Sequence, residues 1–193
     1  MKFSLIVILL SLLNNPTLLI NSQVKSYLDK LETDFDEILF VSIDNQKMYH
    51  FKKQKIISKY VISSSKYGVG NQSGSNKTPK GLHFIKNKIG DNTPINGKMI
   101  GRKFTGEIAK IFSDKTISDT DDITSRILWL SGLEKDINKG KNIDSFKRYI
   151  YIHGTSEEGR LGIPSSHGCI RMKNKDVIDL YKKVEVGTLV LIL

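Results

Sequence analysis

The fold is decided by the stretch Tyr149-Ile150-Tyr151-Ile152-His153-Gly154-Thr155, followed by Leu161-Gly162-Ile163-Pro164-Ser165-Ser166-His167-Gly168-Cys169-Ile170-Arg171-Met172. Alternating aromatic and β-branched residues over 149–152 predict a strand. Two of the four histidines, the only cysteine and three glycines lie in the same stretch. The predicted strand therefore leads directly into a group of side chains that can do acid, base or nucleophilic chemistry.

The flanking sequence is dominated by strand patterns. Short runs rich in β-branched and aromatic residues, separated by turn residues, favour strands over helices. These runs lie at 38–43, 48–51, 55–63, 82–85, 126–130 and 188–193. Helical spacing of apolar residues occurs only over 24–35 and 174–184, where Asn174 is a candidate N-cap. We therefore predict a mainly β, mostly antiparallel domain with one or two short helices.

Residues 90–125 interrupt this pattern. They are polar and dotted with glycine, with an apolar run only around 108–112. A segment of this length in a compact domain is usually a lid or a binding insert. We predict an inserted lid here.

The N-terminus has the composition of an export signal. One lysine precedes the apolar run 3–13, and Asn14, Asn15 and Pro16 follow it. This run is shorter than the ~20 residues of a membrane span. We predict a signal peptide or N-terminal anchor at 1–22, a short helical lead-in at 23–36 and one catalytic domain at 37–193. The protein is then exported to the periplasm or cell envelope, and it contacts a membrane only if residues 1–22 are retained.

The overall composition is that of a folded, basic protein. Of 193 residues, 39% are hydrophobic and 26% charged, and 30 basic residues against 20 acidic ones give a formal net charge of +10. The lysines are scattered, with no basic helix stripe or arginine-rich arm, so we predict no nucleic-acid partner. An anionic wall polymer or membrane surface accounts for the charge equally well.

A single cysteine in an exported chain has no partner for an internal disulfide. A free thiol is mostly protonated at neutral pH, and an adjacent imidazole that takes its proton activates it as a nucleophile. His153 and Cys169 can meet across the intervening loop, while Gly168 permits a sharp bend that directs amides at an oxyanion. His153, His167 and Cys169 are also legitimate zinc ligands, and a purely structural role for all three is the remaining alternative.

A resemblance favours the nucleophile. His153-Gly154-Thr155 with Ser166-His167-Gly168-Cys169-Ile170-Arg171 resembles the signature of the L,D-transpeptidase (YkuD-type) catalytic domain. The turn Thr78-Pro79-Lys80-Gly81 is similar to the Thr-Pro-x-Gly turn of that family, and 127–134 is similar to a segment of one subgroup. The likeness extends from about residue 37 to residue 193, and it implies a β sandwich-like fold.

The resemblance also implies roles. Cys169 would attack the carbonyl at the L-centre of a diamino acid in a peptidoglycan tetrapeptide stem, and D-Ala would leave. His153 would be the base, oriented by the backbone carbonyl of Gly154. His167 would shape the pocket or assist the oxyanion, beside Gly168. We assign Arg171, whose guanidinium forks suit carboxylates, to substrate binding together with Ser166 and Thr155.

The acyl acceptor stays open. A second stem gives a 3–3 cross-link, a lysine gives attachment of an envelope lipoprotein, and a free D-amino acid gives exchange. Water would make the protein an L,D-carboxypeptidase. A non-catalytic wall-binding module and a zinc hydrolase are further alternatives. Neither a metal nor a cofactor is expected for the thiol mechanism.

Overall fold

The computed structural model describes residues 16–193, which form two compact units divided between Asp36 and Glu37. A signal peptide or N-terminal anchor was predicted at 1–22, and residues 1–15 of that range lie outside the described residues. In the first unit, helix α2 spans Pro16–Asp29. It thus starts and ends earlier than the helix predicted over 24–35. Proline suits the first turn of a helix because its fixed φ is helical and its missing N–H has no partner there.

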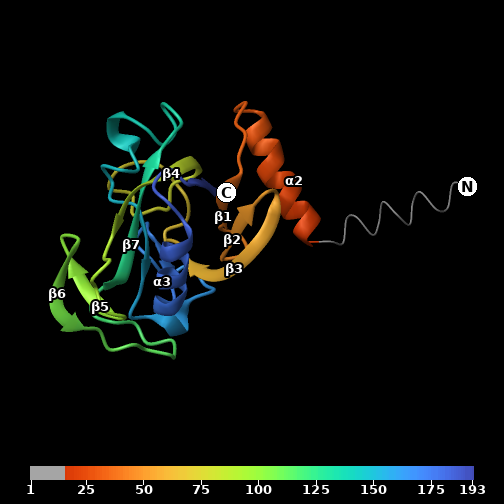
Figure 1. The fold of residues 1–193 in the computed structure, drawn as a ribbon. Helices are drawn as coiled ribbons and strands as arrows, with labels where there is room; N and C mark the ends of the chain where they lie inside the picture. Colours follow the sequence, from red (N-terminus) through yellow and green to blue (C-terminus); the bar gives the residue numbers. More distant parts are fainter. Residues whose placement is uncertain (1–15) are drawn as a thin grey trace, which may run out of the picture. The chain divides into compact units, whose positions relative to one another are not determined.

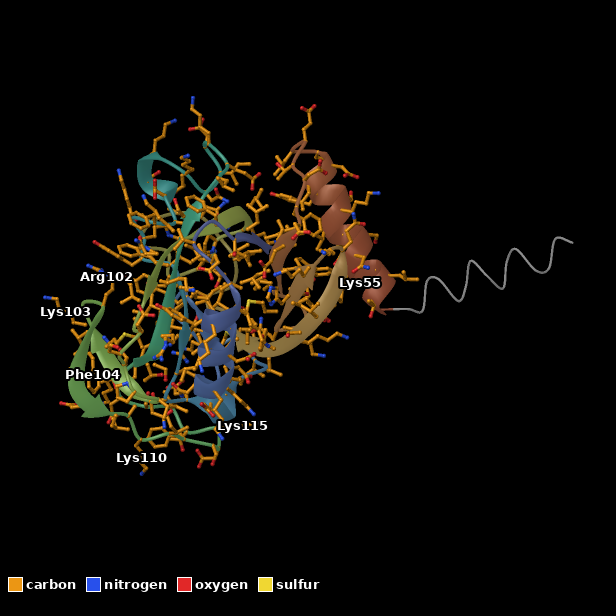
Figure 2. All side chains as sticks on the ribbon, viewed as in Figure 1. Lys55, Arg102, Lys103, Phe104, Lys110 and Lys115 are labelled. Atoms are coloured by element: carbon orange, nitrogen blue, oxygen red, sulfur yellow. The ribbon has the colours of Figure 1, made fainter. Side chains whose placement is uncertain are left out.

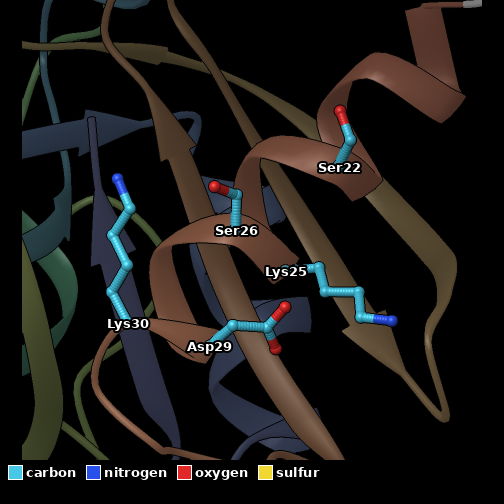
Figure 3. A pocket seen from close by; sticks show the side chains of 5 residues that line it. All are labelled: Ser22, Lys25, Ser26, Asp29 and Lys30. Carbon is cyan, nitrogen blue, oxygen red and sulfur yellow. The ribbon is translucent and has the colours of Figure 1, made fainter.

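Helix α2 carries a shallow hollow along one side (Figure 3). Its lining residues lie at helical spacing or just beyond the helix: Ser22, Lys25, Ser26, Asp29 and Lys30. The set has charges of both signs but no histidine or cysteine, so we assign it no chemistry. Within residues 16–193, the helices are too short or too polar to span a membrane.

The second unit, Glu37–Leu193, is a sheet of ten strands (Figure 1). The strands are β1 Glu37–Ser42, β2 Lys47–Lys52, β3 Lys55–Ser63, β4 Gly81–Ile89, β5 Gly97–Ile100, β6 Lys103–Ile108, β7 Ile123–Gly132, β8 Tyr151–Gly154, β9 Ile170–Met172 and β10 Leu189–Ile192. Helix α3, Asn174–Lys183, and the 3-10 turns η1, Lys141–Ile143, and η2, Glu158–Arg160, complete the unit. The predicted mainly β fold is confirmed.

The strand order is β4-β10-β1-β2-β3-β9-β8-β7-β5-β6, and a further β4–β7 pairing closes the sheet like a barrel. Most neighbours are antiparallel, as predicted. The pairs β1–β10 and β8–β9 are parallel, so the sheet is mixed. Parallel pairs join strands that are distant along the chain, and short-range sequence patterns do not identify them.

One face of this sheet holds the main core, together with the apolar side of α3. It contains Leu128 of β7, Ile152 of β8, Ile170 of β9 and Leu180 of α3, all without solvent exposure. Asn174 was a candidate cap, but the N-cap residue is Lys173. The helix N-terminus is instead satisfied by Glu158, whose carboxylate accepts the Asn174 N–H at 2.8 Å. An acidic group there complements the helix dipole.

The predicted insert 90–125 contains regular structure. Strands β5 and β6 form a hairpin, and β5 pairs with the start of β7 (Figure 1). Residues 109–122 then return to β7 without a strand or helix. Sequence inspection missed the hairpin because β6 is exposed along its whole length, so it shows no alternation of apolar and polar residues.

Candidate active site

The pleat of β7, β8 and β9 sorts side chains onto two faces. Ile152 and Ile170 point to the main core, whereas Trp129, Tyr151 and Cys169 join a second cluster. Successive residues of a strand point to opposite faces, and the register pairs Ile152 with Ile170. The predicted nucleophile therefore lies on the face opposite the main core, next to the chemistry-bearing end of β8.

The side chain of Cys169 is half-buried, and backbone atoms of Tyr149 and Tyr151 hold its sulfur. Its Sγ receives the Tyr151 N–H at 3.4 Å and donates to the Tyr149 carbonyl at 3.4 Å. Burial raises the pKa of the thiol to about 12, and the Tyr151 N–H offsets only part of this. A thiol that donates to a carbonyl carries its proton, so the resting sulfur is neutral.

His153 is the second component of the site. It lies on β8, in register with Arg171 of β9, which is two residues after Cys169. Its Nδ1 is 2.7 Å from the Gly154 carbonyl oxygen, and its side chain is buried. A carbonyl only accepts, so Nδ1 carries the proton and Nε2 keeps its lone pair. Burial lowers the pKa of His153, which keeps the ring neutral and able to accept a proton.

Gly154 is required by close approach of its neighbours. A Cβ at this position would lie 2.5 Å from Asn174 Oδ1 and 2.8 Å from the Thr124 carbonyl oxygen. Only glycine lets β8 fit between β7 and α3 while its carbonyl stays directed at His153 Nδ1. These close contacts explain why the residue that follows His153 is a glycine.

The turn before β9 is fixed by side chains of the two quoted motifs. Gly168 has φ +126°, a backbone conformation that favours glycine. Thr78 Oγ1 donates to the Gly168 carbonyl at 3.0 Å, and Ser166 Oγ donates to the Cys169 carbonyl at 2.6 Å. Ser166 Oγ also accepts the Gly168 N–H at 3.3 Å. Ser166 and Thr78 thus hold the nucleophile's backbone.

A charge network lies beside the turn. Arg171, only 2% exposed, donates to Glu157 at 2.7 Å and to Asp121 at 2.6 Å. The other carboxylate oxygen of Asp121 is 2.7 Å from His167 Nδ1. Burial acts to raise the pKa of Asp121, but the charge of Arg171, the hydrogen bonds to His167 and Arg171, and the effect of His153 when its ring is protonated outweigh it and hold that pKa low.

Three residues were predicted to bind substrate, and the structure places all three in internal contacts. Both terminal nitrogens of Arg171 are paired with carboxylates of the chain. Ser166 is buried, and Thr155 is buried with its hydroxyl accepting the Glu157 N–H at 3.1 Å. These contacts suit positioning of the active-site loops better than contact with a stem peptide.

His167 is the more accessible of the two signature histidines, with 43% of its side chain exposed. Its ring lies 5.8 Å from that of Tyr67. The zinc alternative required His153, His167 and Cys169 to converge as ligands. Among residues 16–193, no three His, Cys, Asp or Glu side chains form a group suited to a metal ion.

The other two histidines are structural in this arrangement. His50 is buried with Nε2 2.6 Å from Glu37. His83 is buried between the Gly81 carbonyl and Ser145 Oγ, each at 2.9 Å. Burial lowers the pKa of His83 to about 4, so this ring is neutral at physiological pH.

Sequence reasoning missed Asp121, Arg148 and the aromatic side chains next to Cys169. Arg148 donates to the carbonyls of Gly70, Asn71 and Lys77 and so ties the 66–80 loop to the site. Asp121 is one of several acidic residues in the polar insert. Nothing in its local sequence distinguishes it from its neighbours.

The family model of YkuD, the L,D-transpeptidase catalytic domain, matches residues 36–192. A probable L,D-transpeptidase, YbiS, of Escherichia coli strain K12 is 46% identical over 41 residues, which cover 21% of this chain and 13% of that protein. The putative L,D-transpeptidase YkuD of Bacillus subtilis strain 168 is 50% identical over 46 residues, which cover 24% of this chain and 28% of that protein. The matched segments thus span less than a third of these relatives.

Solved structures agree on the fold. A crystal structure of an L,D-transpeptidase from Xylanimonas cellulosilytica DSM 15894 aligns with 89% of this chain and 69% of that one, at a TM-score of 0.52 and 16% identity. At that identity the likeness concerns the fold alone. It places the closed, mixed sheet among the folds of L,D-transpeptidases.

Proposed function

Since the chain belongs to the L,D-transpeptidase catalytic domain family, we propose that it is a peptidoglycan L,D-transpeptidase with Cys169 as its nucleophile. The substrate is a tetrapeptide stem. Cys169 attacks the carbonyl at the L-centre of the diamino acid, usually meso-diaminopimelate, and D-Ala is released. The acyl group then passes from the thioester to an amine. Such stems lie outside the cytoplasm, which agrees with an exported protein in the periplasm or cell envelope.

The observation that carries the proposal is that a neutral thiol and a neutral, oriented imidazole lie on the same face of neighbouring segments, Cys169 just before β9 and His153 on β8. Burial raises the pKa of Cys169 and lowers that of His153. The two groups therefore start uncharged, and proton transfer accompanies attack. His153 Nε2 takes the thiol proton as the S–C bond forms, and the Gly154 carbonyl stabilises the resulting imidazolium through Nδ1–H.

The second half of the first step returns that proton. Imidazolium His153 protonates the amine of D-Ala as the C–N bond breaks, which leaves a thioester on Cys169 and a neutral ring. In the next step the ring takes a proton from the incoming amine, and the thiol is released as the new amide forms. His167 is assigned to the substrate side of the turn, because Asp121 fixes its Nδ1 while much of the ring is exposed.

The identity of the acyl acceptor decides which transpeptidase reaction the protein catalyses. An amine of a second stem yields a 3–3 cross-link, a lipoprotein lysine yields anchoring, and a D-amino acid yields exchange. Transfer to water is the second candidate, an L,D-carboxypeptidase that trims tetrapeptides to tripeptides. It shares the same thioester, so the products alone separate the two activities.

The proposal is tested with the purified chain and a disaccharide-tetrapeptide, following intact-protein mass and products together. A transient adduct on Cys169 with loss of D-Ala supports it, while a dimer or a tripeptide product names the acceptor. Cys169→Ala must give neither the adduct nor released D-Ala, and Cys169→Ser must lose turnover while staying folded. Wild-type turnover by Cys169→Ser, or inactivation by chelators but not by alkylation, would contradict the assignment and favour a metal hydrolase. A folded wild type with no adduct favours a wall-binding module.

A further inference from the structure

A group of aromatic rings lies next to Cys169 and has no part in the mechanism above. Trp129 of β7 stacks on Phe146, with ring centroids 4.1 Å apart and planes inclined by 16°. Tyr149 and Tyr151 pack against the same indole at 5.6 and 5.5 Å. These are also the residues whose backbone atoms hold the Cys169 thiol. The rings therefore adjoin the nucleophile.

Arg102 extends over these rings from the turn between β5 and β6, where Figure 2 labels it beside Lys103. Its guanidinium carbon lies 4.8 Å from the Trp129 ring centroid and 5.5 Å from that of Tyr149. One terminal nitrogen is 3.4 Å from the Tyr151 hydroxyl. Aromatic faces attract a cation and orient a flat guanidinium. Arg102 is thus held by rings and not by an opposite charge.

The other arginines of the site are already engaged. Arg171 is paired with two carboxylates, and Arg148 donates to three backbone carbonyls. Among residues 16–193, Arg102 has no acidic partner within ion-pair distance, and its hydrogen bond is to the neutral Tyr151 hydroxyl. Its remaining N–H groups form a fork suited to two carboxylate oxygens. Arg102 is consequently the arginine of this group that is available to an anionic ligand.

The same contacts argue against a sugar ring on Trp129. Phe146 stacks on the indole at 4.1 Å, and Arg102 lies over the ring at 4.8 Å. A stacked phenyl ring and a guanidinium cannot share one face at these distances, so both faces are covered. A sugar would have to displace one of them. A carboxylate needs only the outer edge of the guanidinium.

We propose that Arg102, positioned by Trp129 and Tyr149, binds a carboxylate of the stem peptide while the adjoining carbonyl carbon reacts with Cys169. This inference rests on the proposed function and moves the carboxylate contact predicted for Arg171 to a different residue. Two carboxylates belong to the residues on either side of the cleaved bond and have the required chemistry. One ends the D-Ala that leaves, and the other is the free carboxylate of the diamino acid side chain.

The test uses the full chain, three stems and three variants. The stems are the free acid, the form amidated at D-Ala and the form amidated at the diamino acid. Arg102→Gln removes the charge, Arg102→Lys keeps it without the fork, and Lys103→Gln, at the exposed first residue of β6 next to Arg102, is the matched control. Release of D-Ala or D-alaninamide gives kcat and KM for each combination.

We expect Arg102→Gln to lower kcat/KM for the free acid about tenfold, chiefly through KM, as loss of a charge-assisted hydrogen bond does. Arg102→Lys should recover part of this, and Lys103→Gln should match wild type. For one amidated stem, wild type and Arg102→Gln should be equal, and that stem identifies the carboxylate. Equal losses on all three stems, or no loss on any, would overturn the inference.

A binding measurement keeps the inference testable without turnover. Trp129 is the only tryptophan of the chain, so its fluorescence reports on ligands at Arg102. In Cys169→Ala, the free acid should bind about tenfold more tightly than the relevant amide, and adding Arg102→Gln should abolish this preference. If wild type releases no D-Ala, the proposed function fails. If Arg102→Gln leaves the preference intact, the carboxylate site fails by itself.

Discussion

Reaction of Cys169 with a small neutral disulfide reagent measures the charge state on which the proposed mechanism depends. The thiol belongs to a half-buried side chain and donates to the Tyr149 carbonyl, and its removal from solvent raises its pKa to about 12. Its reaction should therefore be slow at neutral pH and should accelerate steadily as the pH rises. A thiolate–imidazolium pair with His153 would instead react at full rate from mildly acidic pH upward.

The expected rate follows from the ionised fraction. At pH 8 an ordinary thiol with a pKa of about 8.5 is roughly one quarter thiolate. A thiol with a pKa of about 12 is ionised in only about one molecule in ten thousand, roughly 2,000-fold less. A more basic thiolate attacks disulfides faster, with a Brønsted coefficient of about 0.4–0.5, which recovers roughly 40-fold. The folded protein should react roughly 50-fold more slowly than the unfolded chain.

The assay records release of thiopyridone from dithiodipyridine between pH 6 and pH 10, with circular dichroism confirming the fold at each pH. Cys169 is the only cysteine, so the signal has one source. The chain in urea provides the reference, with a plateau near its ordinary pKa. Restricted access of the reagent to the thiol would lower the rate by the same factor at every pH. A raised pKa of the thiol would instead change how steeply the rate rises with pH.

The native rate should rise about tenfold per pH unit across this range. A plateau below pH 8 would refute the reasoning, because it would mean that the thiol is already ionised. The first step would then be attack by a preformed thiolate, and His153 would serve only as the acid that protonates D-Ala.

Three further predictions concern the supports of the site. Gly154→Ala should lower the free energy of unfolding by about 1–3 kcal/mol and nearly abolish turnover, because its Cβ would lie 2.8 Å from the Thr124 carbonyl oxygen; urea unfolding and D-Ala release measure both. His83→Asn should reduce the loss of stability on acidification. The pKa of His83 is lowered from 6.5 to about 4, so between these two pH values only the unfolded chain takes up the proton. The wild type should therefore lose about 3 kcal/mol of its free energy of unfolding as the pH falls through this range. Asp121→Asn should cost about 1–3 kcal/mol, since Arg171 loses one of its two carboxylates, and it should also slow turnover through His167.

The controls for these predictions separate local from general effects. Asp119→Asn removes the same charge from an exposed position of the same insert and should leave stability unchanged. Parallel pH profiles for wild type and His83→Asn would contradict the linkage argument. A Gly154→Ala protein as stable and active as wild type would show that β8 tolerates a side chain at that position.

Much of the fold is predictable from local patterns. The strands at 38–43 and 55–63 follow from runs of β-branched and aromatic residues, and helix α3 follows from apolar residues at helical spacing. The run at 149–152 also predicted a strand, but β8 spans Tyr151–Gly154, because Tyr149 has φ +57° and belongs to the preceding turn. The β5–β6 hairpin was not predicted, because an exposed hairpin needs no apolar face. The parallel β8–β9 pairing, which brings the segment of Cys169 next to the strand of His153, joins residues 18 apart in the register and is equally invisible to short-range periodicity.

By itself, the sequence determined which groups can react: one thiol, two histidines in a glycine-containing signature, and the strand that carries them. Only the tertiary structure decided how those groups are charged and paired. The sequence correctly indicated that the guanidinium of Arg171 suits a carboxylate. The structure shows that its carboxylate partners are Glu157 and Asp121 of the same chain. Arg102, in an unremarked turn, is the cation left available over Trp129. Periodicity and backbone preference are properties of neighbouring residues, whereas burial, pKa and charge pairing arise from contacts between residues far apart in the chain.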